Sequence, residues 1–158
     1  MAKFCWHKHI ALKISLFIWK LLHNGIPTDL AISNKGITIT SKCHCCRIAP
    51  NSEFNTHLFI NSEVGTAVWK FYANLLDIND HAQTIPHMLT KWWIKSKGSS
   101  LYAWLLSVLP CLIIWHIWKS RNKARFDNSD MDHNNIISAI KSQLWISSML
   151  SKLISLLR

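Results

Sequence analysis

The sequence is poor in acidic residues, glycine and proline, and these shortages exclude several classes of protein. Only 8 of the 158 residues are Asp or Glu, and Gly and Pro number 4 each. So little glycine and proline excludes collagen-like chains and flexible linkers. Charged residues make up 16% of the chain and hydrophobic residues 49%, which excludes a disordered tail because such tails are charged and poor in apolar residues. The length suits one ordinary domain or two small ones.

The charge that is present is mostly positive. Lys and Arg number 18, giving a net charge of +10, and seven of these residues lie among the first 50, where only one acidic residue occurs. Such an excess favours polyanionic partners such as RNA or DNA, or an anionic membrane surface. The predicted nucleic-acid-binding residues are the basic residues of this N-terminal part: Lys3, Lys8, Lys13, Lys20, Lys35, Lys42 and Arg47. The nine tryptophans add aromatic surface that can be buried or can stack on bases.

The chain has five cysteines, an odd number. No apolar run followed by small residues is seen near Met1, so no signal peptide is predicted. We therefore expect the protein in the nucleus or cytoplasm. Clustered cysteines there are more often metal ligands or free thiols than disulfides.

The hydrophobic spacing predicts a mainly α-helical fold. Apolar residues recur with helical spacing, and N-cap and stop residues divide them into segments. Residues 37–40 alternate in polarity and predict at most one short β element. Between the helices lies a small irregular loop region with a zinc-knuckle-like cysteine cluster. The predicted helices cover residues 8–23, 29–34, 62–75, 89–95 and 134–157.

The sequence divides into three parts: a domain over residues 1–80, a linker over 81–100, and a helical region over 101–158. An uncharged run of twenty residues begins at Ser99 and ends at Trp118. It is long enough to span a membrane, and basic residues follow it as at a membrane border. However, Pro110 and His116 lie inside it, which favours a buried helix bent near the proline. Both interpretations remain open on the sequence alone.

The cysteine cluster predicts a metal site. Cys43 and Cys46 have the two-residue spacing that lets both thiolates face one zinc ion. His57 follows after a loop of ten residues and is the third candidate ligand. Three candidates exist for the fourth position: Cys45, an oxygen of Glu53, or water. The alternative interpretation is that these cysteines are free thiols on a loop.

Several short motifs follow one another in a definite order along the chain. They are Phe17-Ile-Trp19-Lys20, His23-Asn24, Pro27-Thr28, Gly36-Ile37, Cys43 to Cys46, Glu53, His57-Leu58-Phe59, Val68-Trp69-Lys70 and Ile114-Trp115-His-Ile-Trp118-Lys119-Ser-Arg121-Asn122. In this order they resemble one family: the zinc-binding domain that follows the reverse transcriptase in plant non-LTR retrotransposons. The last, tryptophan-rich motif is similar to one that this family often has before its ribonuclease H domain.

The resemblance implies zinc as cofactor, with one departure. Most of the family has a cysteine five residues after the histidine, and this chain has Ser62 there. A neutral hydroxyl is a poor zinc ligand. The fourth position is therefore lost or is supplied by Cys45, and Ser62 is expected to be the N-cap of the following helix.

The resemblance also implies what the protein does. The chain lacks the Tyr-x-Asp-Asp segment of a polymerase, and its few acids do not offer the four carboxylates of a ribonuclease H site. We therefore expect no enzyme but a retrotransposon-derived fragment that binds RNA or DNA and would assist a reverse transcriptase. Its other partners would be the missing reverse transcriptase and ribonuclease H domains of the parent element. The alternatives are a membrane-associated or partner-packing helical protein that uses residues 99–118, and a decayed remnant with no function.

Overall fold

The computed structural model describes residues 5–6, 10–39, 43–46, 53–78, 82–98 and 100–156. Regular structure in these ranges is helical throughout, and they contain no strand, so the mainly α-helical prediction is confirmed. Residues 37–39 are irregular rather than extended in a sheet, and Thr40 lies outside the described residues. The elements are α2 (Leu12–Leu22), α3 (Asp29–Ser33), the short π-helix η1 (His57–Asn61), α4 (Glu63–Leu75), α5 (Ile85–Lys95), α6 (Leu101–Phe126) and α7 (His133–Leu156).

The helix boundaries follow local sequence signals. Ser62, Thr84 and Ser100 each precede a helix, and each side chain accepts a hydrogen bond from the backbone N–H three residues later. These are the N-caps that hydroxyl side chains provide. Thr28 holds the corresponding place before α3 but makes no such bond. Helix α2 ends where Asn24 adopts a left-handed backbone conformation, with φ of 54°.

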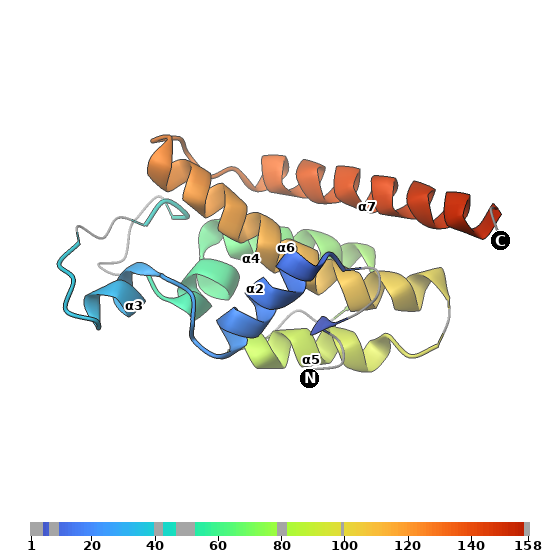
Figure 1. Ribbon diagram of the computed structural model, residues 1–158, viewed down its shortest axis with the longest axis horizontal. Helices are drawn as coiled ribbons and strands as arrows, with labels where there is room; N and C mark the ends of the chain where they lie inside the picture. The colour runs from blue at the N-terminus through green and yellow to red at the C-terminus, as the bar shows by residue number, and fades with distance from the viewer. Residues whose placement is uncertain are drawn as a thin grey trace.

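Helix α6 is the central element of the fold. It packs against α2, α5, α7 and η1, which are therefore gathered around one long helix. Figure 1 shows α7 along one side of the molecule and α5 along the opposite side, with α2, α4 and α6 between them. The chain wraps back on itself, because α2 near the N-terminus lies against α6 from the C-terminal half.

Large aromatic side chains bind these helices together. The Phe17 ring of α2 has its centroid 5.3 Å from that of Trp115 and 5.6 Å from that of Trp118, both on α6. Phe17 also meets Phe59 of η1 at 6.3 Å. These offset and edge-on contacts add about 0.5–1.5 kcal/mol each beyond the area that they bury. They bring η1, and with it His57, against the core.

Residues 81–100, which the sequence predicts to be a linker, contain α5. Trp92 and Trp93 on this helix are buried, and the Trp93 indole N–H donates to the Ser107 carbonyl oxygen at 3.2 Å. The sequence predicts a helix at residues 89–95 but does not indicate how deeply its tryptophans are buried. The division of the chain into three parts remains a prediction. The helices of these parts pack together, since α2 and α5 both contact α6.

Helix α6 also has the length and apolar composition of a membrane span. Over its most apolar 18 residues the mean hydropathy is 1.7, and 67% of that window is buried inside the protein. His116 within it is buried and hydrogen bonds through Nε2 to Gln143 Oε1 of α7 at 2.7 Å. The helix thus occupies the position of a core helix, as expected for the buried interpretation. Helix α6 continues past Pro110 to Phe126.

Candidate metal centre

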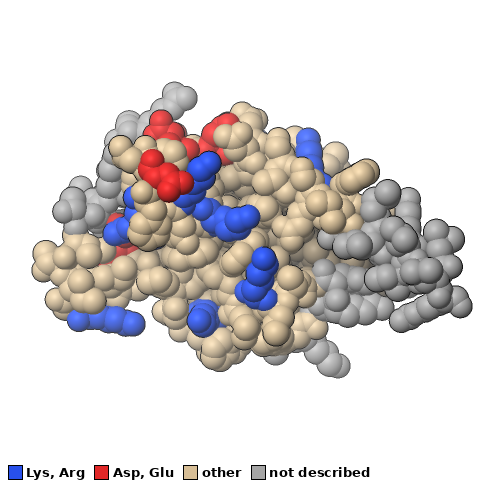
Figure 2. Space-filling view, turned by 45° about the horizontal axis from the view of Figure 1, so that its top comes forward, with Lys and Arg blue, Asp and Glu red and all other residues tan. Residues whose placement is uncertain are grey.

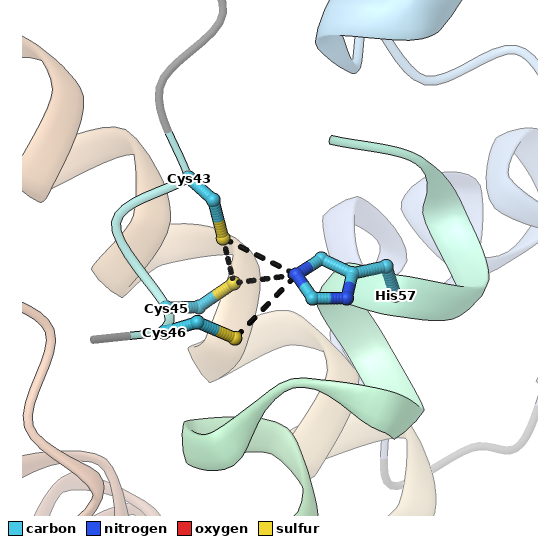
Figure 3. Close-up of side chains that lie close together, drawn as sticks. All are labelled: Cys43, Cys45, Cys46 and His57. Atoms are coloured by element: carbon cyan, nitrogen blue, oxygen red, sulfur yellow. Dashed lines mark hydrogen bonds between the residues drawn. The ribbon is translucent and has the colours of Figure 1, made fainter. Parts of the chain in front are cut away.

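Three cysteines and one histidine converge beside the start of η1. Cys43, Cys45 and Cys46 lie on a short irregular loop, and His57 is the first residue of the π-helix. Figure 3 shows the three sulfur atoms turned toward the imidazole ring. The Nε2 atom of His57 lies 3.2 Å from the Cys43 sulfur, 3.7 Å from that of Cys45 and 3.6 Å from that of Cys46. The loop and the helix together form a four-donor group.

The arrangement fits a zinc ion. The four donor atoms all lie within 4.8 Å of one another. Ligand bonds of about 2.0–2.3 Å in a tetrahedron require donors about 3.5–3.8 Å apart, which the distances from His57 already approach. The sulfur atoms of Cys43 and Cys45 are closer, at 2.8 Å. A set of three thiolates and one imidazole is one that structural zinc sites use. These side chains therefore form a possible metal site for zinc, the cofactor implied by the sequence.

The electrostatics of the cluster favour at least one thiolate. The hydrogen bond from Cys45, assisted by one from His57, lowers the pKa of Cys43 to about 5 even though burial acts in the opposite direction. The same shared hydrogen bond, together with burial, raises the pKa of Cys45. Burial raises the pKa of Cys46 as well. The Cys43 sulfur thus carries a negative charge that a cation would stabilise, and metal binding would deprotonate the neighbouring thiols as well.

The structure distinguishes among the three candidates for the fourth ligand. Cys45 is buried within the cluster, and its sulfur is in contact with Cys43. Glu53 instead faces Arg121, which donates to both of its carboxylate oxygens. A carboxylate held in this way is not free to bind a metal. The adjacent cysteines, Cys45 and Cys46, both reach the histidine, so Cys45 can take the position that a further cysteine would otherwise supply.

Ser62 has a structural role, as its position before α4 predicts. Its hydroxyl donates to the Leu58 carbonyl oxygen at 3.1 Å and accepts from the Gly65 backbone N–H at 2.9 Å. It is fully buried, and it acts to lower the pKa of the neighbouring Cys45 thiol, against the larger effects that raise it. A Cβ atom at position 65 would lie 2.8 Å from the Ser62 oxygen, so glycine is needed for this close approach. The serine thus joins the start of α4 to the wall of the cysteine cluster.

A buried ion network holds the segment before His57 in place. Arg121 of α6 donates through Nη2 to Glu53 at 2.7 Å and to Asp29 at 2.9 Å. The Arg121 side chain is only 4% exposed, and the side chains of Asp29 and Glu53 are each 1% exposed. Arg125 contacts Asp29 as well. The central helix is thereby tied to α3 and to the irregular segment at Glu53, four residues before the histidine.

Exposed carboxylates lie beside the metal centre. A hollow of about 590 Å³ borders the cysteine loop, and Glu63, Asp130 and Asp132 are among the residues that line it. Figure 2 shows acidic side chains gathered at one end of the visible face, whereas basic side chains are spread across it. In a chain with so few acids, this gathering makes the surroundings of the thiols favourable for a cation and unfavourable for a phosphate.

The structure describes only three of the seven basic residues that are predicted to bind nucleic acid. Lys13, Lys20 and Lys35 are exposed, two of them on α2 and one just after α3. The others, Lys3, Lys8, Lys42 and Arg47, lie outside the described residues. The three described lysines are separate from the carboxylates that line the hollow beside the cysteines.

The sequence does not reveal the ion network: in it Arg121 is one of the basic residues that follow the apolar run, and Asp29 is the first residue of a predicted helix. A signal was present: Arg121 follows the apolar run by only three residues, and a chain with 8 acids offers few partners for it. Periodicity alone does not identify which of those acids it meets, since they are 92 and 68 positions away.

Comparison with known proteins supports the metal centre. Residues 1–69 match the family described as zinc-binding in reverse transcriptase. The match covers all four candidate ligands and confirms the resemblance to a reverse transcriptase zinc-binding domain for this part of the chain. Searches of curated proteins and of solved structures found no match.

Proposed function

We propose that the protein is a non-enzymatic, zinc-dependent module that binds nucleic acid and assists a reverse transcriptase of a retrotransposon. The observation that carries this proposal is the four-donor centre of Cys43, Cys45, Cys46 and His57 within a segment that matches a reverse transcriptase zinc-binding domain. A zinc ion there would supply no reaction chemistry. It would crosslink the cysteine loop to η1, which is how structural zinc stabilises small domains.

The charge of the chain supports a polyanionic partner. The net charge is +10, and Lys13, Lys20 and Lys35 are exposed on the α2–α3 part of the domain. Neither Asp29 nor Glu53 competes for these lysines, because both are buried and paired with Arg121. Phosphate groups would therefore meet a basic surface here, with the counterion release and salt dependence typical of nucleic-acid binding.

Salt dependence tests the proposed function. We expect zinc-loaded protein to bind a fluorescein-labelled single-stranded RNA, with binding followed by anisotropy at about 50 and 200 mM salt. Three phosphate contacts predict a loss of affinity of about 20-fold between these conditions. Neutralising Lys13, Lys20 and Lys35 together as glutamines should reduce both the affinity and the salt slope.

The matched control neutralises three other exposed lysines, Lys70, Lys95 and Lys97, and so removes the same charge. It should weaken binding less than the first triple variant. Equal affinity at both salt concentrations would contradict the proposal, as would equal effects of the two triple variants.

A further inference from the structure

A second hollow is lined in part by the three residues that directly precede His57. It has a volume of about 560 Å³ and is formed by the α2–α3 loop, α3 and residues 54–56. This is within the range of about 300–1,000 Å³ found for small-molecule pockets. No Asp or Glu lines it, in contrast to the hollow beside the cysteines. The charge and chemistry of this pocket therefore suit a different ligand.

The two walls of the pocket are held together at fixed points. The Leu30 backbone N–H donates to the Glu53 carbonyl oxygen at 3.0 Å, joining α3 to the segment that leads to His57. The Asn55 amide group donates through Nδ2 to Asn24 Oδ1 at 3.4 Å. The Glu53 side chain is itself held by a hydrogen bond from Arg121. A pocket with anchored walls loses little entropy when a ligand enters it.

Three side chains give the pocket its chemistry. Phe54 is 40% exposed and presents an aromatic surface. The Oδ1 atom of Asn55 is buried and has no hydrogen-bond partner in the described part of the chain, which leaves one acceptor unused. Lys35 lines the same pocket and carries a positive charge. Together they provide a stacking surface, a hydrogen-bond acceptor and a phosphate contact.

We infer that this pocket receives one unstacked base of a single-stranded nucleic acid. The base stacks on Phe54, a base N–H group donates to Asn55 Oδ1, and Lys35 contacts a neighbouring phosphate. Aromatic stacking and backbone lysines are the means by which proteins hold single strands without reading their sequence. The inference rests on the proposed function, because it names the surface through which the module would hold its nucleic acid.

The pocket is physically linked to the metal centre through Phe54. Its ring centroid lies 5.7 Å from that of His57, and the planes are inclined by 46°. A metal ion held by His57 would fix the orientation of that imidazole and so support the aromatic surface on which the base stacks. This contact gives the zinc a role in nucleic-acid binding even though the acidic surroundings of the cysteines disfavour phosphate.

The test compares two probes and matched variants, with binding followed by fluorescence anisotropy at fixed low salt. One probe is a labelled 12-nucleotide single strand, and the other is an abasic strand of equal length, which keeps the phosphates and lacks bases. Wild-type protein should bind the normal strand more tightly. Phe54→Ala should weaken binding to the normal strand by about 5- to 150-fold and leave binding to the abasic strand unchanged. Asn55→Ala should have a smaller effect of the same kind.

Phe126→Ala is the control, since Phe126 is also an exposed phenylalanine, 78% exposed at the end of α6. It should leave both affinities unchanged, and circular dichroism should show that all variants are folded. If wild-type protein binds both strands equally, or if Phe54→Ala behaves as Phe126→Ala does, the pocket is not a base site while the proposed function stands. If zinc-loaded wild-type protein binds neither strand, the proposed function itself is wrong.

Discussion

Removing Arg121 should destabilise the protein more than most single substitutions. Arg121→Met keeps an unbranched apolar side chain of similar length but removes the guanidinium group. The carboxylates of Asp29 and Glu53, each 1% exposed, would then be buried without their shared partner. Breaking a buried ion pair in this way costs about 3–5 kcal/mol, and four hydrogen bonds from Arg121 to these carboxylates are lost.

This loss is large beside a typical total stability of about 5–15 kcal/mol. For a chain of this length it corresponds to a fall in Tm of about 6–20 °C. Urea unfolding followed by tryptophan fluorescence measures it, because Trp118 lies 5.1 Å from the Arg121 guanidinium and other tryptophans line the core. The change should appear in the unfolding midpoint rather than in the slope.

Two further variants make this prediction refutable. Lys123→Met alters an exposed residue on the same helix and should change the free energy of unfolding by less than about 0.5 kcal/mol. Adding Asp29→Asn and Glu53→Gln to Arg121→Met removes the buried carboxylates that have lost Arg121 as their shared partner and should recover part of the loss. If Arg121→Met lowers the free energy of unfolding no more than Lys123→Met does, the ion network does not hold α6 against the metal-binding segment.

Two other substitutions test the start of α4 and the interior of α6. Ser62→Ala should lower the free energy of unfolding by about 0.5–2 kcal/mol, because the Gly65 N–H loses its acceptor, and a thermal melt showing no change would contradict the N-cap role. Burial lowers the pKa of His116, and the hydrogen bond that its Nε2–H donates to Gln143 Oε1 opposes this. The unfolded state therefore binds more protons as pH falls through about 6.5, and stability decreases on acidification. His116→Gln should reduce the difference in unfolding free energy between about pH 7.5 and 5.5, and an unchanged difference would show that His116 does not contribute.

The helical fold was predictable because its signals are local. Apolar spacing located α2, α4 and α7, and Ser62 marked the start of α4 from its position alone. The sequence allowed at most one short β element at residues 37–40, and the described residues 37–39 form none. β-branched alternation yields a strand only where a partner strand exists, and none is present among the described residues. The burial of α5 was also missed, because Trp92 and Trp93 show which surface is apolar but not what will cover it.

The candidate metal site was predictable from spacing for Cys43, Cys46 and His57, and the sequence also offered Cys45 as its fourth member, which the structure places with the other three. Sequence left Cys45, Glu53 and water as alternatives, and only the tertiary pairing of Glu53 with Arg121 removes Glu53 from the choice. The pocket at Phe54 was not predictable for the same reason. It joins two segments that lie about thirty positions apart and meet through the Asn24–Asn55 contact, which no periodicity encodes.

The most direct test of the central claim is the zinc content of purified protein, measured together with that of four variants. Wild-type protein should contain one zinc per chain, and Cys43→Ser, Cys45→Ser and His57→Ala should each lose most of it. Cys111→Ala, which alters a buried cysteine in α6 outside the candidate centre, should retain it. A folded wild-type protein without zinc, or zinc that is unaffected by the first three substitutions, would show that these side chains are not a zinc site.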